Sequence, residues 1–136
     1  MTAIQSRPLS SSTDALLRFA LRADATLTGL AGLAGALFAD PMSRLTGLSP
    51  ATEYLIGAAF VAYGLVVYGL AALPDLRRVG VGICVANVVS TLATLIIVLA
   101  DAAPLTQAGI GATLVTCVYT AVFAGLQYLG VRRLRA

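Results

Sequence analysis

Residues 79–100 read VGVGICVANVVSTLATLIIVLA, an uncharged run of 22 residues. A helix rises 1.5 Å per residue, so about 20 apolar residues cross the roughly 30 Å hydrocarbon layer of a bilayer. This run is therefore long enough to span a membrane as one helix. Three further segments of the same kind lie at about 15–39, 54–73 and 108–131. The sequence predicts an all-α polytopic membrane protein, an antiparallel bundle of four transmembrane helices.

The composition points to the same class of protein. Hydrophobic residues make up 59% of the chain and charged residues 11%, whereas soluble domains are about half apolar and a quarter charged. The chain has no histidine, which excludes imidazole metal ligation and acid/base catalysis by histidine. The sequence also has no zinc motif, nucleophile elbow or dinucleotide fingerprint. We therefore expect a protein that is not an enzyme and has no metal, cofactor or nucleic-acid partner.

Prolines and one serine mark the predicted helix boundaries. Pro41, Pro74 and Pro104 each follow an apolar run, where proline cannot continue a helix. Ser49 and Pro50 together predict a helix start, with serine as the cap and proline in the first helical position. The loops between the spans are short, so neighbouring helices are expected to pack antiparallel.

The arginines predict the orientation. All nine basic residues are arginines, and eight of them lie on one side of the predicted spans, with Arg44 alone on the other. Basic residues are retained on the cytoplasmic side, so both termini are expected in the cytoplasm, with the chain in the inner membrane of a bacterium. Residues 1–14 are expected to form a cytoplasmic polar tail, and residues 15–136 a single transmembrane domain. The first apolar run carries charges and lacks a cleavage-like ending, so it is expected to stay as a helix.

The two predicted hairpins have similar residues at the ends of their helices. Ala39-Asp40 and Ala100-Asp101 each end an apolar run, and each hairpin finishes with paired arginines, at 77–78 and 132–133. Both hairpins begin on the same side of the membrane, so a repeat would be parallel, with its axis along the membrane normal. Two interpretations stay open: a duplicated helical hairpin, or chance likeness between apolar helices.

The first predicted span has a stripe of small residues. Residues 29–35 read GLAGLAG. Pairs of small residues four positions apart, such as Ala25 with Gly29 and Thr28 with Gly32, let helix backbones approach closely. We expect this helix to pack tightly against a neighbour.

One acidic residue within a predicted span is the first candidate for function. Counted along the helix, Asp24 lies roughly 8 Å below the inner edge of the hydrocarbon layer. Ionisable groups at such positions are costly and usually face a bundle interior or a watery cavity. Tyr68, Asn87 and Gln127, one from each other span, lie at similar depth, so we expect the partner of Asp24 among them. Arg22 is shallower and can extend to the interface.

Threonines continue this polar set along the helices. Thr91 follows Asn87 by one turn, and Thr120 lies two turns from Gln127 on the same stripe. The predicted ligand-binding or polar-core residues are Asp24, Arg22, Tyr68, Asn87, Thr91, Thr120 and Gln127. Two interpretations compete. The set is either interhelical hydrogen bonding worth about 0.6 kcal/mol per contact, or an inward-facing pocket where Asp24 exchanges a proton or meets a cation.

Several short motifs carry a family resemblance that covers nearly the whole chain. They are LRADA at 21–25 before the glycine-rich stretch, ADP at 39–41, Asn87 in the third span, and QYLG at 127–130 before the terminal arginines. With these the chain resembles the small four-helix integral membrane proteins of high-GC, actinobacterial-type bacteria. That family brings no assigned activity, so the resemblance implies the fold and the location. Many members have a tryptophan soon after the third-span asparagine, where this chain has valines.

The chain is also similar in architecture to DoxX-like proteins and to small multidrug-resistance transporters. Those transporters carry a glutamate and functional tryptophans and have little charge bias, whereas this chain has Asp24, no tryptophan and a strong arginine asymmetry. We expect it to bind a lipid or other hydrophobic ligand, or to be a subunit of a larger membrane complex. The alternative is a small homodimeric, proton-coupled transporter of hydrophobic compounds that uses Asp24. The expected partners are membrane lipids and either a second copy or other membrane subunits.

Overall fold

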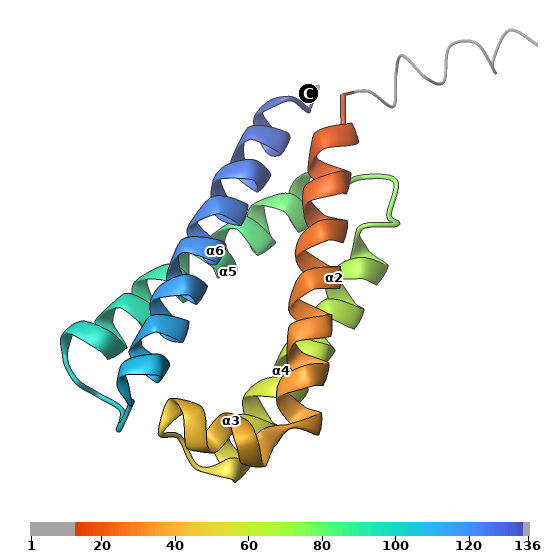
Figure 1. Ribbon diagram of the computed structural model, residues 1–136. Helices are drawn as coiled ribbons and strands as arrows, with labels where there is room; N and C mark the ends of the chain where they lie inside the picture. Colours follow the sequence, from red (N-terminus) through yellow and green to blue (C-terminus); the bar gives the residue numbers. More distant parts are fainter. Residues whose placement is uncertain (1–12, 135–136) are drawn as a thin grey trace, which may run out of the picture.

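The computed structural model describes residues 13–134, which contain helices and no strand (Figure 1). The predicted all-α class is confirmed. The helices of the described part are α2 (Ala15–Leu37), α3 (Ala39–Thr46), α4 (Pro50–Leu70), α5 (Arg77–Leu99) and α6 (Gln107–Arg132). The predicted cytoplasmic tail, residues 1–14, lies almost entirely outside the described residues.

Three of these helices, α4, α5 and α6, are long and apolar enough to cross a membrane. The sequence predicted four spans. Helix α2 is long enough, with 23 residues, but Arg18, Arg22 and Asp24 lower its hydropathy. It is therefore not among the helices that are apolar enough to cross a membrane. Large apolar side chains point outward on the other helices; Leu65 is 72% and Leu99 75% exposed. Helices that are apolar all round suit lipid rather than water, and the chain is a multi-pass helical membrane protein.

A short helix, α3, stands where the sequence predicted only a loop. The first long helix ends at Leu37, two residues earlier than predicted, and Pro41 lies in the first turn of α3. Proline is tolerated there because the first N–H groups of a helix have no intrahelical partner. The sequence does not distinguish a proline that follows one helix from a proline in the first turn of the next, which is why a loop was expected here. Helix α3 ends at Thr46, and the residue that caps it, Gly47, has a φ of 90°, which is left-handed and favours glycine.

Side-chain caps set the starts of α4 and α6. The Ser49 hydroxyl accepts a hydrogen bond from the Thr52 amide at 3.1 Å, with Pro50 as the first helical residue, as the sequence predicts. The Thr106 hydroxyl accepts from the Gly109 amide at 3.0 Å. Helix α4 is helical from residue 50, whereas the predicted apolar span began at 54, because the capped first turn is polar and does not register as part of an apolar run.

The long helices pack as two hairpins, α2 with α4 and α5 with α6. In the first hairpin the backbones approach at glycines. A Cβ on Gly57 would lie 2.5 Å from the Gly32 oxygen, and one on Gly64 would lie 2.6 Å from the Ala25 oxygen. Only glycine fits at such distances. The close packing predicted for the small-residue stripe therefore occurs between α2 and α4.

The two hairpins contact each other from one end of the molecule to about the middle of α2, where the Thr28 and Tyr119 hydroxyls lie 3.1 Å apart, and again at the opposite end (Figure 1). At the end where the described part of the chain begins and finishes, Leu17 of α2 fits against Gly80 of α5 and Gly130 of α6. At the opposite end, the Thr106 amide donates to the Thr46 oxygen at 2.9 Å, which ties α3 to the start of α6. Between these ends α4 and α5 make almost no contact. The middle of the bundle is therefore where a cavity can form.

We predict that Gly57→Ala lowers the free energy of unfolding by about 1–3 kcal/mol, the usual cost of overpacking a tight contact. The added methyl group would lie against the backbone of α2 near Gly32 and Ala36. Gly69→Ala is the matched control on the same helix, because nothing lies within 4 Å of a Cβ there. Unfolding by a denaturing detergent would measure both. Equal stability of the two variants would contradict the glycine contact.

Candidate functional site: the Asp24 cluster and the adjacent cavity

The Asp24 carboxylate lies where all four long helices come together, and its side chain is fully buried. Its Oδ2 atom accepts three hydrogen bonds. The donors are Tyr63 Oη of α4 at 2.7 Å, Asn87 Nδ2 of α5 at 3.0 Å and Gln127 Nε2 of α6 at 3.0 Å. One oxygen atom of α2 is therefore bound by a side chain from each of the other three long helices.

The other carboxylate oxygen is also occupied. Asp24 Oδ1 accepts from the Thr28 hydroxyl at 3.0 Å and from the Tyr119 hydroxyl at 2.9 Å. These two hydroxyls lie 3.1 Å from each other. An ionised carboxylate offers about four lone-pair positions, and here it has five donor contacts. Its capacity to accept further hydrogen bonds is filled by the protein.

The buried carboxylate is balanced by hydrogen bonds rather than by a cation. Within residues 13–134 no arginine forms an ion pair with Asp24; the ion pair that the structure gives there joins Arg18 to Asp14 at 2.8 Å. A buried polar group is costly unless its hydrogen bonds are made. Every buried side-chain nitrogen and oxygen of the described residues has a partner, so the cluster around Asp24 is complete.

Four of the predicted polar residues gather beside Asp24. Asn87 and Gln127 contact its carboxylate directly, and Asn87 Nδ2 also donates to Gln127 Oε1 at 2.9 Å. Thr91 lies one turn beyond Asn87, where it donates to the Asn87 backbone oxygen at 2.9 Å. Thr120 lies two turns from Gln127, and its hydroxyl is 2.7 Å from that of Thr91. These contacts join α5 to α6 and extend the polar set along the bundle.

The other two predicted residues, Arg22 and Tyr68, lie outside this cluster. Tyr68 is 51% exposed, and the Arg22 guanidinium carbon lies 5.9 Å from the centre of its ring. The expected partner of Asp24 is thus found in Asn87 and Gln127, whereas Tyr68, the third candidate, does not contact it. Tyr68 has the right depth, but residues five apart on a helix point about 140° away from each other. The tyrosine of α4 that faces Asp24 is Tyr63.

The sequence interpretation missed two residues of the cluster, Tyr63 and Tyr119. Counting residues along a helix gives the depth of the Cα atoms, whereas a tyrosine side chain carries its hydroxyl several ångströms away from the backbone. Tyr63 lies next to Gly64, which faces α2 at close range. The glycine stripe does not single out Tyr63, because Tyr68 lies about 40° from Gly64 around the helix and Tyr63 about 100° from it.

A cavity of about 560 Å³ adjoins the cluster, between the two hairpins. Thr28, Tyr63, Asn87 and Tyr119 belong both to the cluster and to the cavity wall, whereas Asp24 does not line the cavity. The remaining wall is made mostly of small or apolar residues, together with serine and threonine, from all four long helices. Helices α4 and α5 hardly touch each other, so the cavity is not closed on the side between these two helices.

Comparison with known proteins found no matching family model, no matching curated protein and no matching solved structure. The chemistry of the cluster and the cavity is therefore the basis for proposing a function.

We predict that Asp24→Ala lowers the free energy of unfolding by about 3 kcal/mol or more, since each buried donor left without a partner costs about 1–3 kcal/mol. Asp24→Asn should cost less, because the Thr28 and Tyr119 hydroxyls can turn to accept from the new amide. Asp101→Asn is the control, an exposed aspartate whose φ of 51° asparagine also adopts. Unfolding in mixed micelles would measure the series. Asp24→Ala as stable as Asp101→Asn would contradict the structural role.

Proposed function

We propose that this chain is a non-enzymatic four-span protein of the bacterial inner membrane that binds a hydrophobic ligand, such as a lipid acyl chain, between its two hairpins. The observation that carries this proposal is the cavity beside the Asp24 cluster. Its volume of about 560 Å³ lies in the range of roughly 300–1,000 Å³ of known ligand pockets. The family resemblance of the sequence agrees with the location and the fold, and adds no activity.

The fourth span in this proposal is α2. It packs along α4, and its charges lie toward one end, where Arg18 and Arg22 can extend to the interface. Asp24, the deepest charge, is supplied with five donor contacts, which offsets the cost of a carboxylate in the membrane. The end of the bundle where the described chain begins and finishes would face the cytoplasm, where the arginines are concentrated.

The chemistry of the cavity wall favours an uncharged, apolar ligand. No charged side chain lines it, and residues such as Ala59, Phe60 and Ala93 offer only hydrocarbon. The threonine hydroxyls of the wall are engaged within their own helices, and the two tyrosine hydroxyls are bonded to Asp24. Thr94 donates to the Ser90 oxygen at 2.8 Å; a hydroxyl bonded in this way presents mainly its methyl group to a neighbour. An acyl chain entering from the membrane meets these conditions.

Binding is preferred to the alternative of proton-coupled transport because of the position of Asp24. Its carboxylate is fully buried, lies outside the cavity wall, and has no free position for a cation or a substrate. A transported cation would first have to displace the Tyr63 and Tyr119 hydroxyls. Binding is also preferred to a purely structural role as a subunit, because contacts with another membrane protein do not require a cavity within the bundle.

The lack of tryptophan in the chain provides a direct test. Phe60→Trp would place a single tryptophan in the cavity wall, which can be excited selectively over the five tyrosines. In vesicles of phosphatidylcholine with brominated acyl chains, we expect strong quenching of this tryptophan, because an acyl chain occupies the cavity. Ala93→Phe, which fills the cavity, should reduce the quenching. Ala112→Phe is the control, since Ala112 is exposed and does not line the cavity.

Phe123→Trp gives the protected reference, because Phe123 is only 8% exposed. If Phe60→Trp were as protected as Phe123→Trp, no acyl chain would enter, and the proposal would fail. Uptake of a hydrophobic cation driven by a proton gradient, and lost in Asp24→Asn, would instead support the transporter.

A further inference from the structure

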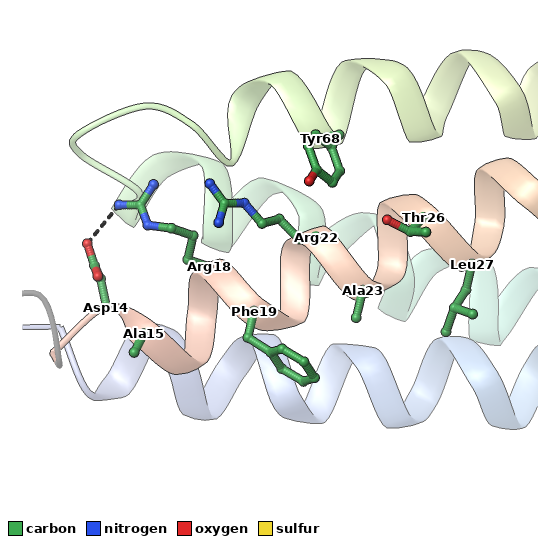
Figure 2. Close-up of a pocket in the computed structure, with 9 residues that line it drawn as sticks. All are labelled: Asp14, Ala15, Arg18, Phe19, Arg22, Ala23, Thr26, Leu27 and Tyr68. Carbon is green, nitrogen blue, oxygen red and sulfur yellow. Dashed lines mark hydrogen bonds and ion pairs between the residues drawn. The ribbon is translucent and has the colours of Figure 1, made fainter.

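A second hollow lies on the outer face of α2 and adjoins the cavity between the hairpins at Leu27, which lines both. It is a groove of about 660 Å³ formed by the first half of α2 and by Tyr68 of α4. Figure 2 shows that Arg18 and Arg22 project toward α4 on one side of the groove, whereas Phe19 and Leu27 project to the other side. The groove therefore has one cationic wall and one apolar wall.

The two arginines of this groove are used differently. Arg18 is committed to the protein. It forms an ion pair with Asp14 at 2.8 Å and donates to the backbone oxygens of Ala71 at 2.5 Å and Leu73 at 3.1 Å. These contacts hold the chain at the end of α4. Arg18 is thus a structural residue whose charge is balanced by Asp14.

Arg22 has neither an acidic partner nor a hydrogen bond within residues 13–134; its recorded contact is with the Tyr68 ring, 5.9 Å from the guanidinium carbon. A cation over an aromatic face is attracted by the ring, so Tyr68 holds the guanidinium beside the groove while leaving its N–H donors available. With Asp14 already paired to Arg18, the groove keeps one uncompensated positive charge.

We propose that this groove binds an anionic phospholipid of the cytoplasmic leaflet, with the phosphate on Arg22 and an acyl chain along Phe19 and Leu27. Guanidinium groups match phosphate with two parallel hydrogen bonds. Leu27 lies about 7 Å deeper along the helix than Arg22 and about 140° around it, so the lipid would cross the face of α2 formed by Ala23 and Thr26, which also line the groove. A zwitterionic lipid lacks the net charge that Arg22 would neutralise. The inference rests on the membrane position proposed for α2 and is independent of the ligand in the cavity.

The test is lipid binding by the full chain purified in a mild neutral detergent, measured by native mass spectrometry. Phosphatidylglycerol and phosphatidylcholine with the same acyl chains are titrated separately. We expect wild type to bind phosphatidylglycerol about fivefold more tightly, which corresponds to the usual contribution of one arginine near an anionic membrane surface. Arg22→Gln should lose that preference, and Arg22→Lys should keep part of it.

Arg78→Gln is the matched control. Arg78 is exposed in the first turn of α5, at the same end of the bundle, and does not line the groove. It should keep the preference for phosphatidylglycerol within twofold of wild type. Equal losses in Arg22→Gln and Arg78→Gln would overturn the proposal, because net charge alone would then explain binding. Equal binding of the two lipids by wild type would also overturn it.

The cavity variant Ala93→Phe separates this inference from the proposed function. It should leave the preference for phosphatidylglycerol unchanged, because Ala93 lines only the cavity between the hairpins. If Ala93→Phe abolished phosphatidylglycerol binding while Arg22→Gln did not, the anionic lipid would occupy the cavity. That outcome would overturn the groove proposal and still support a ligand in the cavity.

Discussion

A carboxylate that is fully buried within a helical bundle has no access to bulk water, so the protein itself must supply its hydrogen bonds. Asp24 imposes this constraint on the whole bundle. Its five donor contacts come from α2, α4, α5 and α6. They can be made together only when the two hairpins have one particular separation and one particular rotation relative to each other. The glycine contacts between α2 and α4 then fix the first hairpin, and the Asp24 cluster fixes the second hairpin against it.

The cavity follows from the same arrangement. The hairpins are joined near Asp24 and again where Thr106 contacts Thr46, and they diverge between these points. The side chains of the cluster surround the Asp24 carboxylate and separate it from the cavity. Two of them, Tyr63 and Tyr119, also form part of the cavity wall. The polar groups are thus engaged with one another, and what remains open to a ligand is largely hydrocarbon. A charged residue in the bundle core and an apolar binding cavity are compatible for this reason.

The sequence predicts the features that depend on one helix at a time. Uncharged runs identify α5 and most of α4 and α6, and the Ser49 cap places the start of α4. The depth of Asn87 and Gln127 places both beside Asp24. Depth alone does not determine which face of a helix a residue occupies, so it indicates Tyr68 and does not identify Tyr63. The cavity depends on the angle between two hairpins, which no local pattern of residues encodes.

The central claim, that the Asp24 carboxylate joins the two hairpins, is tested most directly by a double-mutant cycle across the hairpin interface. Asp24→Ala, Asn87→Ala and the double variant would be unfolded in mixed micelles alongside wild type. Residues in direct contact show coupling of about 0.5–3 kcal/mol, and residues without shared partners are nearly additive. A coupling free energy of at least about 1 kcal/mol is expected, because the contact is charge-assisted. Additive effects of the two substitutions would contradict the claim.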